Sequence, residues 1–327
     1  MGSLAARVAF DDGAVSRAAD VLVRGGLVAI PTETVYGLAA DATNGEGVAG
    51  IFAAKNRPQF NPLIAHVSNI AMAERYVDFD AVSLKLAQKF WPGPLTIVLP
   101  LKKNQDAEPP IHPLVTAGLK TLAIRMPQGK VGDVIKALDH PVAAPSANTS
   151  GRISPTSAKA VADDLGDRLD LILDGGACGV GVESTIVKVE GESVYLLRPG
   201  GLAAEEIENF LGQKLVRAAH DAVIQAPGMM QSHYAPDASV RLNASDVNPG
   251  EALLAFGPHR AAHADKAVAV LNLSASADLR EAAANLFDFM LQLDASGAKT
   301  IAVEPIPMAG LGEAINDRLK RAAAPRT

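Results

Sequence analysis

Short apolar runs alternate with segments of helical periodicity along the first two thirds of the chain. Runs rich in Val, Ile and Leu predict buried strands, and apolar residues that recur every three or four positions predict helices. This alternation is typical of α/β architecture. We expect strands at 27–30, 63–67, 95–99, 122–125, 142–144, 169–173, 185–189 and 194–197, and helices at 15–23, 47–55, 83–90 and 203–211.

The pattern changes after residue 213. Residues 214–239 have weak periodicity and contain the sequence Ser-His-Tyr-Ala-Pro at 232–236. A second α/β pattern follows, with strands expected at 252–256, 267–271 and 300–303 and helices near 279–293 and 311–323. The sequence therefore predicts a first domain at 1–213, a linker or lid at 214–239, which is usual for long irregular connections, and a smaller second domain at 240–327.

Composition narrows the class of protein. A hydrophobic fraction of 48% excludes wholesale disorder, and a net charge of −6 argues against a protein that coats nucleic acid. A single cysteine, Cys178, can form neither an internal disulfide nor a cysteine-built zinc site. We therefore expect a reducing, cytoplasmic location. No apolar run is long enough for a membrane helix, and no secretory signal is apparent, so we expect no membrane partner.

Several catalytic signatures are absent from the sequence. It contains no G-x-x-x-x-G-K-[ST] phosphate loop, no H-E-x-x-H pair and no G-x-S-x-G elbow. The glycine-rich stretch 175–181 precedes an expected strand, whereas a dinucleotide fingerprint opens a helix. The seven histidines are scattered without metal-ligand spacing. We therefore expect no metal held by protein side chains.

Five polar clusters lie beside the expected strands. They occupy residues 31–37 (PTETVYG), 55–66, 121–127, 144–156, and 182–187 together with 198–200. Arg57, Arg125 and Arg198 each offer a forked donor to a carboxylate or phosphate. Ser146, Asn148, Ser150 and Ser154, with Gly151, would let backbone N–H groups approach phosphate oxygens. No nucleophile with a base and an orienting acid is evident. The set favours phosphoryl or nucleotidyl transfer, which depends on positioning and charge stabilisation.

Each cluster also has a purely structural interpretation. Lys55 and Arg57 lie at an expected helix end, where cations favour the helix dipole. His66 alternates within a strand, as a packed histidine would, and 31–37 or 146–156 could be simple turns. For most clusters taken singly, the structural interpretation is preferable to a functional one. The joint occurrence of five clusters at strand ends favours a shared anion site.

The five clusters, in this order, resemble the threonylcarbamoyl-AMP synthase family. The resemblance covers about residues 8–212, and the Ser-His-Tyr-Ala-Pro tail with its second α/β pattern is similar to the longer, two-domain branch. It implies a YrdC-like twisted mixed sheet with helices and a large concave cavity, followed by a smaller Rossmann-like α/β domain.

The resemblance also implies an activity. L-threonine, bicarbonate or CO2, and ATP would give L-threonylcarbamoyl-AMP and pyrophosphate, and a separate complex would transfer the group to an adenosine beside the tRNA anticodon. Mg²⁺ would accompany ATP, held mostly by phosphate oxygens and water. The chain would meet tRNA and the transfer complex only indirectly.

Site residues follow from the same resemblance. Threonine-binding positions correspond to Thr34, His66, Arg125, Ala144 and Ser184. ATP-binding positions correspond to Arg57, Asn61, Thr121, Ser146, Ser154, Arg198 and Tyr234. Lys55 and Arg57 would act catalytically by offsetting charge that develops at the α-phosphate. We expect the linker around Tyr234 to fold back as a lid over the nucleotide.

Three alternatives differ in class. A non-enzymatic RNA-binding module with the same fold would bind tRNA with a steep salt dependence and turn over no ATP. A carbamoyltransferase of hydrogenase maturation shares the YrdC-like domain but carries zinc-binding cysteine pairs, which this sequence lacks. An unrelated amino-acid adenylating ligase would not depend on bicarbonate.

Overall fold

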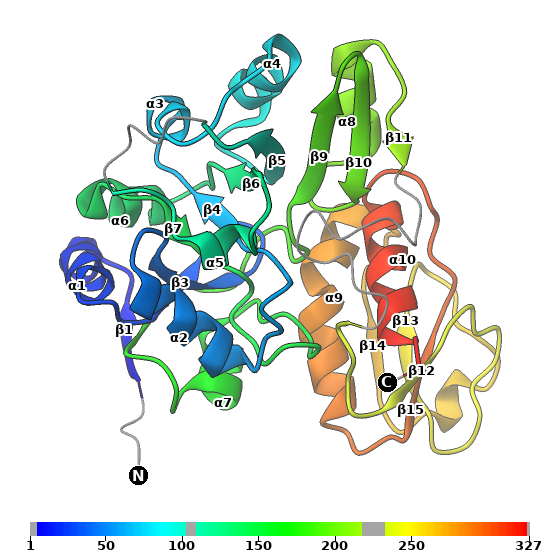
Figure 1. Ribbon diagram of the computed structural model, residues 1–327. Coiled ribbons are helices and arrows are strands. Elements are labelled where there is room, and N and C mark those ends of the chain that lie inside the picture. Colours follow the sequence, from blue (N-terminus) through cyan, green and yellow to red (C-terminus); the bar gives the residue numbers. More distant parts are fainter. Residues whose placement is uncertain (1–4, 103–108, 218–232, 326–327) are drawn as a thin grey trace.

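A computed structural model describes residues 5–102, 109–217 and 233–325 (Figure 1). A large mixed sheet and a small parallel sheet organise these residues. In spatial order the large sheet contains β1 (Ala6–Ala9), β8 (Leu171–Asp174), β2 (Val28–Pro31), β3 (Tyr36–Asp41), β7 (Val142–Ala143), β4 (Ile64–His66), β6 (Thr121–Arg125), β5 (Leu95–Pro100), β9 (Thr185–Glu190), β10 (Ser193–Arg198) and β11 (Val216–Arg217).

Helices flank this sheet. They are α1 (Asp12–Val23), α2 (Gly45–Lys55), α3 (Ile70–Glu74), α4 (Ala81–Phe90), α5 (Pro113–Thr116), α6 (Val131–Leu138), α7 (Ala158–Leu165) and α8 (Ala204–Leu211). Side chains cap several of them: Asp11 accepts from the backbone N–H of Ala14 at the start of α1, and Asp80 accepts from those of Val82 and Ser83 at the start of α4. All eight strands expected in the first domain are present, with ends shifted by one or two residues.

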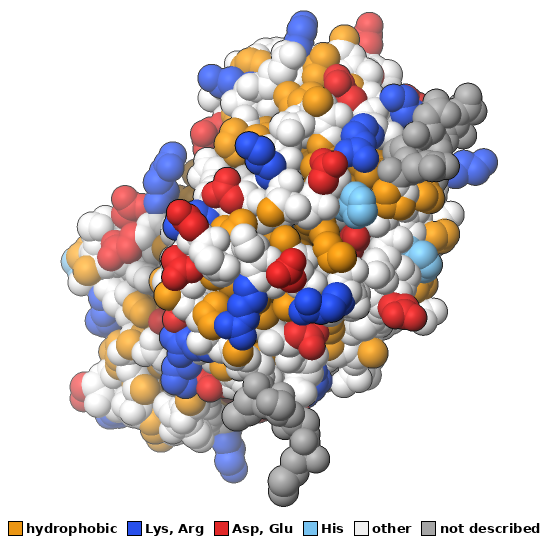
Figure 2. Space-filling model, turned by 90° about the vertical axis from the view of Figure 1, so that its left-hand side faces the viewer, with side chains coloured by type: hydrophobic (Ala, Val, Ile, Leu, Met, Phe, Trp, Pro, Cys, Tyr) orange, Lys and Arg blue, Asp and Glu red, His pale blue; other side chains and the backbone are white. Residues whose placement is uncertain are grey.

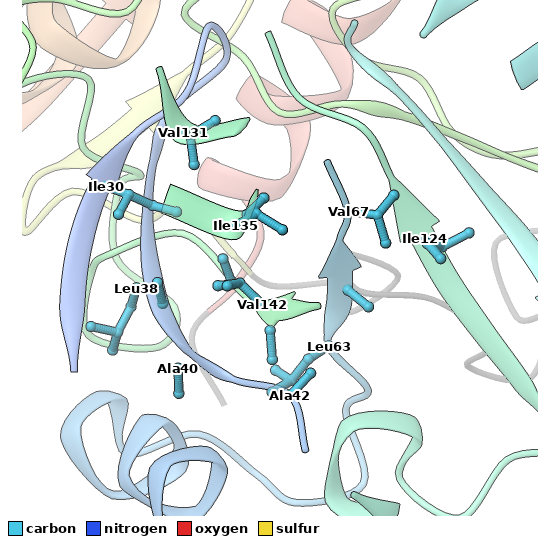
Figure 3. Packing of buried hydrophobic residues seen from close by; sticks show 14 of the residues in the cluster. Ile30, Leu38, Ala40, Ala42, Leu63, Val67, Ile124, Val131, Ile135 and Val142 are labelled. Carbon is cyan, nitrogen blue, oxygen red and sulfur yellow. The ribbon is translucent and has the colours of Figure 1, made fainter. Parts of the chain in front are cut away.

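At the central strands β4, β6, β5 and β9, the main core lies on one face of the large sheet, whereas at β8, β2 and β3 it reaches both faces. Figure 3 shows Val131 and Ile135 of α6 among side chains from several strands, including Ile30, Leu38 and Val142. Helix α6 is strongly amphipathic, and its buried positions Val131, Val134, Ile135 and Leu138 recur at helical spacing. In the central strands, this packing fixes which face points away from the core.

The opposite face carries the polar residues of the central strands. Side chains alternate along a strand, so the core residues Leu122 and Ile124 place Thr121, Ala123 and Arg125 on the other face of β6. A small apolar cluster, Ile64, Val98, Ala123 and Ile186, also lies there. The candidate site is built on this face.

The small sheet consists of parallel strands. Its order is β12 (Ser239–Arg241), β15 (Thr300–Val303), β13 (Ala252–Ala255) and β14 (Val270–Asn272), accompanied by η1 (Ala264–Lys266), α9 (Leu279–Asp294) and α10 (Leu311–Ala322). All-parallel pairing agrees with the expected Rossmann-like pattern. No helix among the described residues is long and apolar enough to cross a membrane.

The second core reaches into the first domain. Buried residues of α9 and α10, such as Phe287 and Ile315, cluster with Val35, Ile153 and Val182 from loops of the first domain. Helix α9 stands beside that domain (Figure 1), where the Gly181 backbone lies so close that an added Cβ would be 2.2 Å from the Ala283 carbonyl oxygen. The two sheets are thus joined through a shared apolar interface.

Candidate functional site

A cavity on the polar face of the large sheet gathers most of the predicted site residues. It is lined by Thr32, Thr34, Val35, Gly37, Arg57, Ile64, His66, Arg125, Ala144, Pro145, Ser146, Glu183, Ser184, Arg198, His233 and Tyr234. Its free space is about 50 Å³, whereas ligand pockets commonly measure roughly 300–1,000 Å³. The expected large concave cavity is therefore contracted here, and His233 and Tyr234 form part of its wall.

Strand register brings two of these residues together. Strands β4 and β6 are parallel, and their last residues, His66 and Arg125, are direct partners. The loop between β2 and β3 supplies Thr34, whose hydroxyl accepts a hydrogen bond from Arg125 Nη1 at 3.0 Å. Arg125 Nε donates to the Gly93 carbonyl at 3.1 Å, and Nη2 forms a 2.7 Å ion pair with Glu33. A fixed cation, a hydroxyl and an imidazole thus converge at this end of the cavity.

His66 is a neutral group in this environment. It is buried, and its Nδ1 lies 3.2 Å from the Ile64 carbonyl oxygen. Burial, and then the nearby charge of Arg125, lower the pKa of His66 to about 3. An uncharged imidazole suits hydrogen bonding to a ligand, whereas it would be a poor proton donor at neutral pH.

Arg57 and Arg198 supply positive charge at a second part of the cavity. Asn56 ends α2 in the left-handed conformation, and Arg57 then donates to the carbonyls of Asn61 at 3.2 Å and Pro62 at 2.8 Å. Arg198, the last residue of β10, donates to the Ser184 carbonyl at 2.8 Å. Burial lowers the pKa of each guanidinium to about 10, so both stay charged at neutral pH.

Four predicted residues do not line this cavity. Lys55 is fully buried and donates to the backbone carbonyls of Ser146, at 2.5 Å, and Asn148, so it supports their loop; burial lowers its pKa well below the usual value. Ser154 donates to Glu183 at 2.5 Å. Asn61 is buried beside Arg57, and Thr121 lies on the same face of β6 as Arg125 but at the other end of the strand.

Several lining residues are absent from the predicted site. Glu33, which contacts the cavity through Arg125, and the lining residue Glu183 stand inside the polar clusters. The lining residue His233 stands in the linker, directly before Tyr234. No spacing rule marks any of the three. Their role depends on partners distant in sequence. Burial alone would raise the pKa of Glu183, but the charges of Arg318 and Arg198 outweigh it and lower that pKa to about 2.

The predicted lid is described only at its ends. Residues 218–232 lie outside the described residues. At the carboxyl end of the linker, Tyr234 is buried, with its ring centroid 4.1 Å from that of His233 and 5.5 Å from that of Phe287 in α9. Ala235 donates its backbone N–H to the Gly151 carbonyl at 2.9 Å. The end of the linker therefore lies against both domains at the cavity.

In the parts of the chain that the structure describes, no group of three or more His, Cys, Asp or Glu side chains is placed to hold an ion. A larger cavity of about 770 Å³ lies between α7 and α9. Its walls carry both signs of charge, including Arg152, Lys159 and Asp294, so its chemistry differs from that of the arginine-rich site.

Two family models together match most of the chain. The Sua5/YciO/YrdC model, described as telomere recombination, matches residues 20–200. The model described as the threonylcarbamoyl-AMP synthase C-terminal domain matches residues 202–324.

Individual proteins agree with this result. A threonylcarbamoyl-AMP synthase of Bacillus subtilis is 38% identical over 97% of this chain and 94% of its own length. One of Schizosaccharomyces pombe is 46% identical over 66% of this chain and 60% of its own length. The crystal structure of P. abyssi Sua5 complexed with L-threonine superposes with a TM-score of 0.85 at 35% identity, covering 98% of this chain and 97% of that one. This chain belongs to the threonylcarbamoyl-AMP synthase family.

Proposed function

We propose that this protein joins L-threonine, bicarbonate or CO2, and ATP into L-threonylcarbamoyl-AMP with release of pyrophosphate. A separate complex would then transfer the threonylcarbamoyl group to an adenosine next to the tRNA anticodon. The observation that carries this proposal is that one cavity joins an Arg125–Thr34 end to an Arg57–Arg198 end. The L-threonine complex of the P. abyssi relative supports the choice of amino acid.

L-threonine would bind at the Arg125 end. The Arg125 guanidinium would receive the carboxylate in place of, or beside, Glu33, which now forms its ion pair. Thr34, neutral His66 and Ser184 would offer small polar groups to the amine and the hydroxyl, and Ala144 would leave room for the methyl group.

ATP would bind at the Arg57 end. Arg57 and Arg198 would contact the phosphates, with Ser146 and the loop that Lys55 holds alongside. Tyr234 would pack against the nucleotide, and Asn61, Thr121 and Ser154 would serve as outer contacts. Mg²⁺ would arrive with the triphosphate, held chiefly by phosphate oxygens and water. The free space is smaller than these substrates need, so the proposal requires the cavity to widen when they bind.

The reaction would proceed by displacement at the α-phosphate. The amine of threonine takes up CO2 and loses a proton to give a carbamate. One carbamate oxygen then forms a bond to the α-phosphorus while the bond to the pyrophosphate oxygen breaks. Buried guanidiniums offset the developing charge. The product is a labile mixed anhydride, so the enclosed site would also limit hydrolysis.

Cysteine usage supports a cytoplasmic location for this protein. The single cysteine, Cys178, is buried, and burial raises its pKa to about 12. A chain with one inert thiol and no possibility of an internal disulfide suits the reducing cytoplasm.

The decisive experiment is pyrophosphate release with ATP, Mg²⁺, L-threonine and bicarbonate, omitting each component in turn. We expect release to require all four, and Arg57→Ala to abolish it. Release that ignores threonine or bicarbonate would contradict the proposal, and bicarbonate independence alone would indicate an amino-acid adenylating ligase.

An RNA-binding module makes the opposite prediction. It would bind tRNA with a steep salt dependence and release no pyrophosphate. On the face shown in Figure 2, Lys and Arg side chains are interspersed with Asp and Glu, without a patch of one sign. That face offers no extended electrostatic footprint for nucleic acid.

A further inference from the structure

A buried arginine of the second domain reaches the wall of the cavity. Arg318 lies on α10 and has no exposed surface. Its Nε donates to Glu183 Oε2 at 2.8 Å, and its Nη1 donates to Asp317 Oδ2 at 2.6 Å. Its guanidinium carbon lies 5.3 Å from the centroid of the Tyr234 ring. One side chain therefore contacts two residues that line the candidate site.

Glu183, the partner of Arg318 in the first domain, also contacts other residues of the site. Besides Arg318, its carboxylate accepts the Ser154 hydroxyl at 2.5 Å. The next residue, Ser184, accepts Arg198 through its backbone carbonyl at 2.8 Å and through its hydroxyl at 3.2 Å. The position of the 183–184 backbone thus sets the position of Arg198.

Tyr234 depends on the same arginine. Its ring stacks on Phe287 of α9 at a centroid distance of 5.5 Å and an interplanar angle of 24°, and it contacts Arg318. Tyr234 also has a positive φ of 63°, a conformation that non-glycine residues adopt only when their surroundings hold them. Arg318 and Phe287 provide that support from the second domain.

Burying a guanidinium is costly even when it is paired, and apolar residues of similar volume often serve stability as well. The burial of Arg318 is therefore better explained by the residues that it positions than by a gain in stability. We propose that Arg318 is a positioning residue, through which the second domain fixes Glu183, Arg198 and Tyr234 at the nucleotide end of the site. This inference rests on the proposed function.

Two substitutions test it. Arg318→Met removes the whole guanidinium group. Arg318→Lys keeps the positive charge but loses the planar guanidinium that donates to Glu183 and lies beside the Tyr234 ring. Ser154, Arg198 and Tyr234 belong to the proposed ATP contacts, so we expect the KM for ATP to rise about tenfold in Arg318→Met and several-fold in Arg318→Lys. The KM for L-threonine should rise less than the KM for ATP, because Ser184 is the only proposed threonine contact that adjoins Glu183 in the chain.

Arg217→Gln is the matched control. It removes another ion pair to α10, between Arg217 and Glu313 at 2.7 Å, but at a half-exposed position. We expect both KM values to remain at the wild-type level in this variant. Thermal unfolding of every variant, measured alongside, separates loss of fold from loss of positioning.

The outcomes are distinct. Folded variants in which both KM values are unchanged, or rise equally, would overturn the inference. If Arg318→Met does not fold, Arg318→Lys decides in the same way. A wild-type chain that releases no pyrophosphate would defeat the proposed function itself, whereas an active wild type with Arg318 variants that behave like Arg217→Gln would defeat only the role of Arg318.

Discussion

Arg125 and Glu33 form a buried ion pair. Substitutions at these two residues should separate the effect of Arg125 on activity from its effect on stability. Arg125→Ala would leave the Glu33 carboxylate without its counter-ion, and breaking such a pair costs about 3 kcal/mol of unfolding free energy. We expect Arg125→Ala to abolish pyrophosphate release and to lower stability. Adding Glu33→Gln should restore most of the stability but no activity, as measured by urea unfolding and pyrophosphate release.

The double variant shows whether an unpaired Glu33 carboxylate causes the loss of stability. If it stays as unstable as Arg125→Ala, the loss of stability does not come from an orphaned carboxylate. If Arg125→Ala retains the wild-type rate, Arg125 does not bind the threonine carboxylate.

Two buried histidines predict how stability depends on pH. Burial lowers the pKa of His66 and of His233 to about 3, against 6.5 for an ordinary histidine. Below pH 6.5 the unfolded chain takes up protons that the folded chain does not, so the free energy of unfolding falls as pH drops towards 3. Urea denaturation at pH 8, 6 and 5 should show this decline.

Replacement of a buried histidine should flatten the decline. We expect His233→Asn to weaken the dependence on pH between 6.5 and 5. His259→Asn, which replaces an exposed histidine, should leave it as in the wild type. Equal slopes in all three proteins would contradict the assignment to buried neutral imidazoles.

At the scale of elements, a glycine loop meets a helix of the other domain. Gly181 has a φ of 79°, and an added Cβ would lie 2.2 Å from the Ala283 carbonyl oxygen in α9. Gly181→Ala should therefore lower the free energy of unfolding by about 1–3 kcal/mol. Gly179→Ala is the control, because nothing lies within 4 Å of its Cβ position. Equal stability of both variants would show that the loop gives way without cost.

The elements that the sequence predicts well are those with continuous apolar runs or clear helical stripes. Strand β15 and helices α9 and α10 match their expected ranges almost residue for residue. Strand β3, Tyr36–Asp41, is not among the expected strands. Only its first two residues belong to the polar cluster 31–37, and it contains glycine and alanines of low strand propensity. Its burial comes from packing between β2 and β7, which no local pattern encodes.

At the scale of the whole molecule, the second domain completes the first. A chain ending after Leu215 would expose Val35, Ile153 and Val182, which now cluster with α9 and α10, and would lack Tyr234. We expect this truncated protein to release no pyrophosphate and to bind the apolar dye ANS more strongly than the full chain. Full activity in the truncated protein would contradict both the lid prediction and the shared core.

The candidate site contains residues that the sequence predicts and residues that it does not. Residues at strand ends, such as His66 and Arg125, could be predicted to converge because register aligns the ends of neighbouring strands. Arg318 could not, because it stands on an ordinary amphipathic helix and its partners lie in distant segments. The orientation of Lys55 towards carbonyl groups could not be predicted either, because a sequence gives the charge of a side chain but not its direction.

Val35 has a consequence for the order of folding. This residue, in the hairpin loop near the start of the chain, packs in the same cluster as Phe287 and Leu286, far downstream. Contacts between such distant segments form slowly, because loop closure must precede them. We therefore expect refolding from urea to show a fast phase, in which each sheet assembles, and a slow phase, in which α9 docks on the hairpin and synthase activity returns.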